Sequence, residues 1–301
     1  MAEKIGLIGL GLVGSALAER FTAAGFALVG YDVDASRYDA LAAFNSGGAP
    51  GAPSVVERAG SPCEVAKRVG RIVLSLPNST VVEAVVAGPN GVLCGAERGS
   101  VVIDTTTAHP VRSAELAERV RRRGVHFVDA TISGSSRQIR DAQATVMAGG
   151  DKAIVEAQQD IFRTFAPKVF YMGPNGKGAE TKLLVNLVLG LNRLALAEGL
   201  AMGIRAGVAP ETLLEVLKSS AAYSQIMDTK GAKMIAGGGA PEARLRQHLK
   251  DVNLILEMGE RVKARLPVSA LHAQLLGEAV ESGFGDQDNS AIINVFLGKR
   301  G

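Results

Sequence analysis

The chain has 301 residues, enough for two domains of ordinary size, and 47% of them are apolar and 21% charged. This balance excludes a chain that is disordered along its whole length. The formal net charge of +3 does not predict nucleic-acid binding, and with no tryptophan the chain lacks an aromatic platform for a single strand. Two cysteines make no disulfide framework, so the sequence predicts a reducing, cytoplasmic setting.

Short β-branched runs alternate with amphipathic stretches through the first half of the chain. The runs predict strands at residues 5–10, 27–31, 71–76, 101–104, 126–130, 145–148 and 168–171. The stretches between them predict helices at residues 17–24, 36–44, 80–86, 114–123 and 153–165. This alternation is typical of βαβ units that build a mostly parallel, doubly wound sheet.

A glycine-rich breaker at residues 172–178 ends the alternation, and no strand is predicted after it. Helical spacing follows at 179–206, 210–219, 243–264, 268–281 and 290–298, with a loop at 237–241. We therefore predict an α/β fold, with a Rossmann domain over 1–173 and an all-helical domain over 174–301 built on the long helix. That helix could span a bilayer by length, but its polar residues Asn186, Asn192, Arg193 and Glu198 predict burial in protein, not membrane.

A GxGxxG motif, Gly9, Gly11 and Gly14, lies between the first strand and a helix that begins at residue 15. The second strand ends at Asp32, at the spacing expected of a dinucleotide-binding fingerprint. The motif, with its intervening Leu10, Leu12 and Val13, predicts that the pyrophosphate binds at the helix N-terminus. Asp32 predicts ribose binding and favours NAD over NADP, while Arg37 keeps NADP open as a phosphate partner.

Further motifs keep their order along nearly the whole chain and resemble the β-hydroxyacid dehydrogenase family of the 3-hydroxyisobutyrate dehydrogenase type. They are GLGLVG at 9–14, DTTTAHP at 104–110, DATISGS at 129–135, MAGG at 147–150, Lys182 with Asn186, and Lys250 with Asp251. The resemblance implies that Leu76, Pro77, Thr107 and Lys250 contact the dinucleotide. It also implies that Ser133 and Gly134 hold the substrate, that Lys182 is the catalytic acid/base and that Asn186 orients the substrate.

The residues themselves suit oxidation of an alcohol, which needs a base within hydrogen-bond reach of the substrate hydroxyl. Lys182 opens an apolar helix, where lost hydration favours the neutral amine, and Asn186 projects from the same face. The N–H groups and hydroxyls of Ser133, Gly134 and Ser135 suit a carboxylate. Ser135 replaces the family's second glycine, so the loop departs from the family pattern and leaves the substrate's identity open.

The predicted enzyme is therefore an NAD-dependent oxidoreductase that converts a small 3-hydroxy acid to its semialdehyde. Two alternatives remain: an NAD(P)H-dependent reductase of small semialdehydes, glyoxylate or imines, and a non-catalytic NAD-binding module. The module would not need Lys182, Asn186 or Lys250. No histidine or cysteine spacing predicts a metal. The apolar long helix predicts a homodimer or homotetramer, and a small carboxylic acid substrate is the other partner expected.

Overall fold

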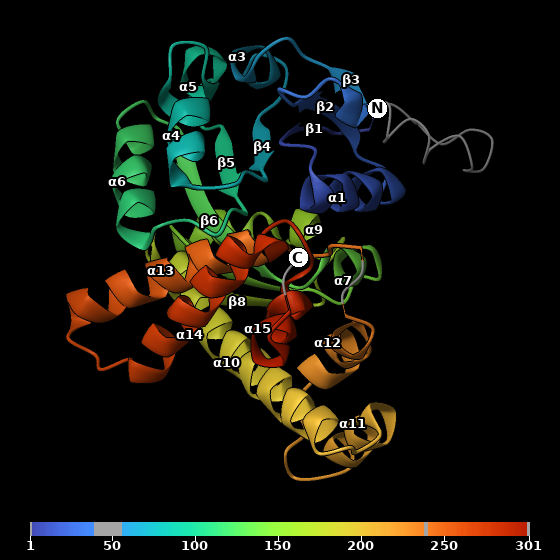
Figure 1. The fold of residues 1–301 in the computed structure, drawn as a ribbon. Helices are drawn as coiled ribbons and strands as arrows, with labels where there is room; N and C mark the ends of the chain where they lie inside the picture. The colour runs from blue at the N-terminus through green and yellow to red at the C-terminus, as the bar shows by residue number, and fades with distance from the viewer. Residues whose placement is uncertain (1, 39–55, 238–239, 300–301) are drawn as a thin grey trace. The chain divides into compact units, whose positions relative to one another are not determined.

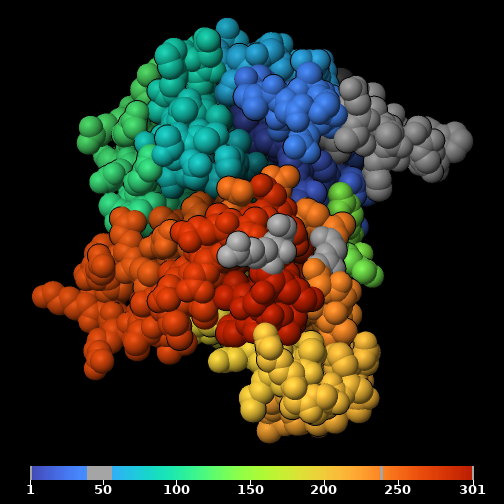
Figure 2. Space-filling view, in the orientation of Figure 1, coloured from blue at the N-terminus to red at the C-terminus, as the bar shows by residue number. Residues whose placement is uncertain are grey.

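The computed structural model describes residues 2–38, 56–237 and 240–299 (Figure 1), and its contacts divide the chain into two compact units, residues 1–182 and 183–301. In Figure 2 the atoms of the first unit run from blue to green and those of the second from yellow to red. The division lies inside α10 (Lys177–Arg205), later than the boundary after residue 173 that the sequence predicts. The first turns of α10 belong to the first unit because Thr131 and Asp129 of that unit hydrogen-bond the backbone of Gly178 and Ala179.

The first unit is built on one eight-stranded sheet in the order β3-β2-β1-β4-β5-β6-β7-β8. Its strands are β1 (Lys4–Ile8), β2 (Ala27–Tyr31), β3 (Val56–Arg58), β4 (Arg71–Leu74), β5 (Val101–Asp104), β6 (His126–Ser133), β7 (Thr145–Gly149) and β8 (Lys168–Gly173). Neighbouring strands are parallel except for β6 and β7. Only residues 134–144 separate those two strands, which is too short for a parallel crossover.

Two apolar cores cover the two faces of this sheet, because successive strand side chains point to opposite faces. In β4, Val73 packs into the core that contains Phe21 and Phe162, whereas Ile72 and Leu74 pack into the other core. The covering helices are α1 (Leu12–Ala23), α3 (Pro62–Ala66), α4 (Ser79–Ala87), α5 (Val92–Gly95), α6 (Pro110–Arg121), α7 (Ser136–Arg140), α8 (Lys152–Glu156) and α9 (Gln159–Phe162). This doubly wound arrangement confirms the predicted fold class.

Several local predictions differ from the structure. The predicted helix over 153–165 is two short helices, α8 and α9, and β3 was not predicted. The predicted helix over 36–44 is helical at residues 36–38, and its remainder lies outside the described residues. Cys63 and Cys94 form a disulfide between α3 and α5, with Cα atoms 5.3 Å apart. The thiols gave part of the support for a cytoplasmic setting, and their pairing removes that support.

The second unit is helical, and the part of it that the structure describes contains no strand beyond an isolated bridge between Arg244 and Asp288. Its elements after α10 are α11 (Pro210–Lys218), α12 (Ile226–Ile235), α13 (Leu245–Val262), α14 (Pro267–Ala279), the π segment η1 (Val280–Phe284), the 3-10 segment η2 (Asn289–Ile292) and α15 (Ile293–Leu297). The helix α10 has the length and hydropathy of a membrane span, and 44% of its most apolar window is buried. Leu196, Ala197 and Leu200 of α10 lie in the apolar core of this unit, as expected of a helix buried in protein.

Candidate functional site

The predicted nucleotide residues of the first unit lie where parallel strands end at one edge of the sheet. Between β1 and β4 the strand order changes direction, and the crevice at the carboxyl ends of such strands is where ligands bind in open α/β sheets. Gly9 follows β1, Asp32 follows β2, Pro77 follows β4 and Thr107 follows β5. Topology thus brings these four sequence positions to the same edge.

The three motif glycines have the geometry of a phosphate-binding turn. Gly9 has φ +93°, and a Cβ there would lie 2.2 Å from the carbonyl oxygen of Ser75. A Cβ on Gly14 would lie 1.9 Å from the carbonyl oxygen of Gly9, so helix and strand pack too closely for a side chain. At Gly11 a Cβ would meet no described atom within 4 Å, and α1 begins there without a side-chain cap. The residues therefore fit a pyrophosphate against the N–H groups of Leu12 and Val13.

Asp32 links the end of β2 to the glycine turn. Its carboxylate accepts hydrogen bonds from the backbone N–H of Leu10 at 2.6 Å and of Asp34 at 2.8 Å. Arg37, the candidate partner of a 2′-phosphate, instead forms an ion pair with Asp34 at 3.2 Å. An acidic group thus lies where the sequence predicts ribose binding, and the nearby Arg37 guanidinium is engaged by Asp34.

Threonines hold the loops that follow β4 and β5. Thr106 accepts a hydrogen bond from the N–H of Leu76 at 3.1 Å, and Thr105 donates one to the carbonyl oxygen of Leu74 at 2.7 Å. These bonds place Leu76 and Pro77 beside the segment that carries Thr107. The family resemblance implies a role for Thr107 only, whereas Thr105 and Thr106 hold the loop on which Thr107 lies.

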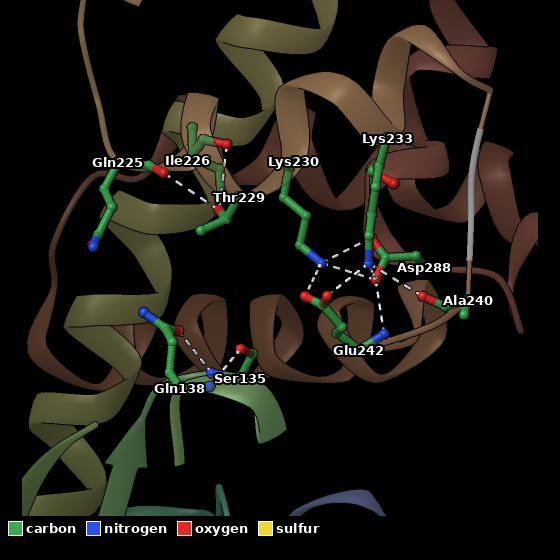
Figure 3. Close-up of polar contacts among 11 residues, drawn as sticks. Ser135, Gln138, Gln225, Ile226, Thr229, Lys230, Lys233, Ala240, Glu242 and Asp288 are labelled. Carbon is green, nitrogen blue, oxygen red and sulfur yellow. Dashed lines mark hydrogen bonds and ion pairs between the residues drawn. The ribbon is translucent and has the colours of Figure 1, made fainter. Parts of the chain in front are cut away.

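The loop after β6 carries the predicted carboxylate-binding residues. Ser133 ends β6, and Gly134 follows with φ +154°. Ser135 caps α7: its hydroxyl accepts from Gln138 N–H at 3.3 Å, and its own N–H donates to the Gln138 side chain at 2.9 Å (Figure 3). The hydroxyl of Ser135 is therefore used within the loop, so its contribution to substrate binding would be to shape the backbone beside Ser133.

Arg137 and Arg140 of α7, which follow this loop, pair with carboxylates of the protein itself. Arg140 forms an ion pair with Glu19 at 2.6 Å, and the Arg137 side chain is 81% exposed beside Asp141. Both arginines behave as surface charges of α7.

The start of α10 is held by Asp129 of β6, which the sequence analysis did not assign. Asp129 accepts hydrogen bonds from the N–H groups of Gly176 at 2.9 Å and Ala179 at 3.0 Å, and from the Asn175 side chain at 3.3 Å. Burial raises the pKa of this carboxyl, and the three hydrogen bonds oppose that rise. The contact fixes the position and rotation of the helix that carries Lys182.

Three polar residues of α10 share one buried face: Lys182, Asn186 and Arg193, with 8%, 6% and 4% of their surfaces exposed. Spacings of four and seven residues place them within about 40° of one another around the helix axis. An amine on this face can act as the base that an alcohol oxidation requires, and the amide beside it can hydrogen-bond a substrate oxygen.

Asp251 of α13 connects Asn186 to Lys250. Asn186 donates to Asp251 through Nδ2 at 3.0 Å, and Lys250 Nζ lies 2.9 Å from the other carboxylate oxygen. In the sequence, Asp251 is recognisable only as part of a motif with Lys250. Its role in holding Asn186 is not, because Asp251 and Asn186 are 65 positions apart and no local pattern predicts the pairing.

The second unit also contains a buried ion-pair cluster (Figure 3). Lys230 of α12 lies 2.9 Å from Asp288 and 3.3 Å from Glu242, and Lys233 lies 2.9 Å from Glu242. Burial disfavours the Asp288 carboxylate, but the hydrogen bonds and charge of Lys230 and the backbone N–H groups outweigh it and lower its pKa to about 2. This cluster ties α12 to the segment before η2.

Two family models match consecutive parts of the chain. Residues 4–173 match the NAD binding domain of 6-phosphogluconate dehydrogenase, and residues 176–296 match the NAD-binding domain of NADP-dependent 3-hydroxyisobutyrate dehydrogenase. The chain belongs to the β-hydroxyacid dehydrogenase family. Members of this family are NAD(P)-dependent dehydrogenases of hydroxy acids, so the family match supports pyridine-nucleotide binding by this chain.

Relatives with different named substrates match over almost the whole chain. The 2-(hydroxymethyl)glutarate dehydrogenase of Eubacterium barkeri is 32% identical, over 97% of this chain and 94% of its own length. The L-threonate dehydrogenase of Cupriavidus necator is 30% identical, over 99% and 97% of the two chains. Among solved structures, a 3-hydroxyisobutyrate dehydrogenase from Salmonella typhimurium has a TM-score of 0.87 at 24% identity, over 97% and 99% of the chains. This likeness confirms the fold.

Proposed function

We propose that the protein oxidises a small 3-hydroxy acid to its semialdehyde, with NAD as the hydride acceptor. The observation that carries the proposal is the buried polar face of α10. Lys182 and Asn186 lie one helical turn apart on this face, and Asp251 holds Asn186. A non-catalytic nucleotide-binding module would have no use for a buried amine on this face, because burying a charged or polar group is costly.

In this proposal Lys182 accepts the hydroxyl proton of the substrate at Nζ as the alcohol carbon loses its hydride. Asn186, held through its Nδ2 by Asp251, orients the substrate oxygen with its amide. The N–H groups at Ser133 and Gly134 bind the carboxylate. The nicotinamide, when bound, supplies the hydride acceptor. Reversal of the same steps reduces a semialdehyde, with Lys182 as the acid.

The preference for NAD rests on two contacts at the end of β2. Asp32 presents a carboxylate at the ribose position and would repel a 2′-phosphate. The nearby Arg37 is paired with Asp34, so it is not held ready for that phosphate. The named activities of the relatives support a hydroxy acid as the substrate class and differ in the acid itself.

The test is nicotinamide reduction by purified protein with NAD or NADP against a panel of small 3-hydroxy acids. Turnover should be higher with NAD and should fall about 10²–10⁴-fold in Lys182→Ala, the range for a lost acid/base. Lys177→Ala is the matched control, because Lys177 is an exposed lysine on the same helix. Equal turnover in Lys182→Ala would refute the assigned base. Nucleotide binding without turnover on any acid, aldehyde or imine would support the non-catalytic module.

A further inference from the structure

Arg193 is a buried cation that the proposed reaction leaves without a role. Only 4% of its surface is exposed, and its Nε and Nη1 have no hydrogen-bond acceptor among the described residues. Burial lowers the pKa of this guanidinium to about 10, against the opposing charges of Asp288 and Asp251, so it stays charged at neutral pH. A buried charge with unmet donors is costly, so a group that compensates it on binding would bind strongly.

The acidic groups near Arg193 already have other partners. Asp251 accepts from Asn186 and pairs with Lys250, and Asp288 pairs with Lys230 (Figure 3). Each of these two carboxylates therefore faces a lysine, and Arg193 remains as an additional positive charge in this region.

Other buried polar groups of the second unit carry no negative charge. His272 of α14 is 2% exposed, and burial together with the charge of Arg193 lowers its pKa to about 4, which leaves the imidazole neutral. Asn289 Oδ1 and Ser290 Oγ, directly after Asp288, are buried polar atoms without a hydrogen-bond partner in the described residues.

The position of Arg193 on α10 relates it to the proposed substrate residues. Asn186 lies seven residues earlier on the same face, about 10 Å along the helix axis. Helical side chains lean toward the N-terminus, and the carboxylate of Asp251, which binds Asn186, also acts electrostatically on Arg193. A substrate held at Asn186 would meet this guanidinium with a group a few carbons away from the alcohol.

We propose that Arg193 binds a second carboxylate of the substrate and makes the enzyme selective for hydroxy dicarboxylic acids. The proposal rests on the hydroxy-acid oxidation proposed above. A guanidinium presents two parallel N–H donors that match a carboxylate, and the acceptor-free Nε and Nη1 are donors of this kind. A monocarboxylic acid of the same skeleton would leave these donors unmet.

The test compares 2-(hydroxymethyl)glutarate with 2-(hydroxymethyl)pentanoate, which has the same carbon skeleton without the terminal carboxylate. We expect kcat/KM to favour the diacid by roughly 100-fold, the scale of a buried charge pair. Arg193→Met should remove this preference and leave turnover of the monoacid within a few-fold, and Arg193→Lys should keep part of it. Arg205→Met is the matched control, because Arg205 is an exposed arginine on the same helix.

A second readout does not depend on turnover. Glutarate should raise the Tm of the wild type and of Arg205→Met but not that of Arg193→Met. If Arg193→Met does not fold, the same comparison with Arg193→Lys decides.

Equal kcat/KM for the two acids in the wild type would overturn the proposal. So would an equal loss on both acids in Arg193→Met. If neither acid is oxidised with NAD or NADP, the proposed function fails for these acids. The glutarate measurement then decides the inference alone: a shift that needs Arg193 supports it, and the absence of a shift overturns it.

Discussion

Asp251 of the second unit supports the proposed chemistry indirectly, by holding two other site residues. Asp251 touches Asn186 with one carboxylate oxygen and Lys250 with the other, so its charge holds two proposed site residues at once. Asp251→Asn keeps the shape and removes that charge. We expect kcat to fall about 10²-fold, because small misplacements of reacting groups cost this much.

Asp228→Asn is the matched control for Asp251→Asn, because Asp228 is an exposed aspartate of the same unit that contacts Tyr223 at 2.7 Å. Steady-state kinetics over a range of pH separates a positioning role from a structural one. A change in Tm together with unchanged kcat would contradict the positioning role.

At the scale of elements, α10 presents two opposite faces. Its exposed apolar stripe, Leu184, Val188, Ala195 and Met202, lies on the side away from Lys182, Asn186 and Arg193. Leu184, Val188 and Met202 are 53%, 58% and 75% exposed in the single chain. Apolar side chains in one row of this kind favour contact with another protein surface.

We expect this stripe to form the contact between copies of the chain, as the predicted dimer or tetramer requires. Val188→Glu should lower the molar mass measured by light scattering toward that of a monomer, because it would bury a charge in the contact. Val262→Glu on α13 is the control, because Val262 is also exposed, at 54%. An unchanged mass for Val188→Glu would place the contact elsewhere, and a monomeric wild type would refute the predicted oligomer.

Sequence patterns predicted the elements that depend on local order. The strand rich in isoleucine and leucine before Gly9, and the turn after it, are local features, and both form as predicted. The three-residue strand β3 is too short to show a period, and α12 has Gly231 inside it and no side-chain cap. Asp129 acts on residues about 46 to 50 positions away, so its role follows from the fold alone.

At the scale of the whole molecule, buried charges make stability depend on pH. The pKa of Asp288 falls from 3.8 to about 2 in the folded chain, mainly through Lys230 acting against burial. A lowered carboxyl pKa contributes stability above pH 3.8, and this contribution is lost as the pH falls toward about 2. The fold should therefore weaken in this pH range.

Lys230→Met tests this source of stability. It should lower the free energy of unfolding at pH 7 by about 3 kcal/mol, because it removes the nearest cation of a buried carboxylate and leaves Lys233 at 3.9 Å. The difference from the wild type should shrink below pH 3.8, as Asp288 takes up a proton. Urea unfolding at pH 7 and pH 3 measures both values, with Lys233→Met as the control for a more exposed lysine. A difference that is the same at both pH values would contradict this origin.

The opposite faces of α10 also make its angular setting critical. A shift of the helix by one residue turns it by about 100° and replaces Lys182, Asn186 and Arg193 with their next neighbours, which are all leucines. Hydrophobic burial alone would favour the leucines, so apolar packing does not select the working register. The carboxylate of Asp129, which accepts hydrogen bonds from backbone N–H groups before Lys182, fixes the rotation of the helix. Loss of these hydrogen bonds would allow a well-packed molecule in which leucines replace the polar groups on the buried face of α10.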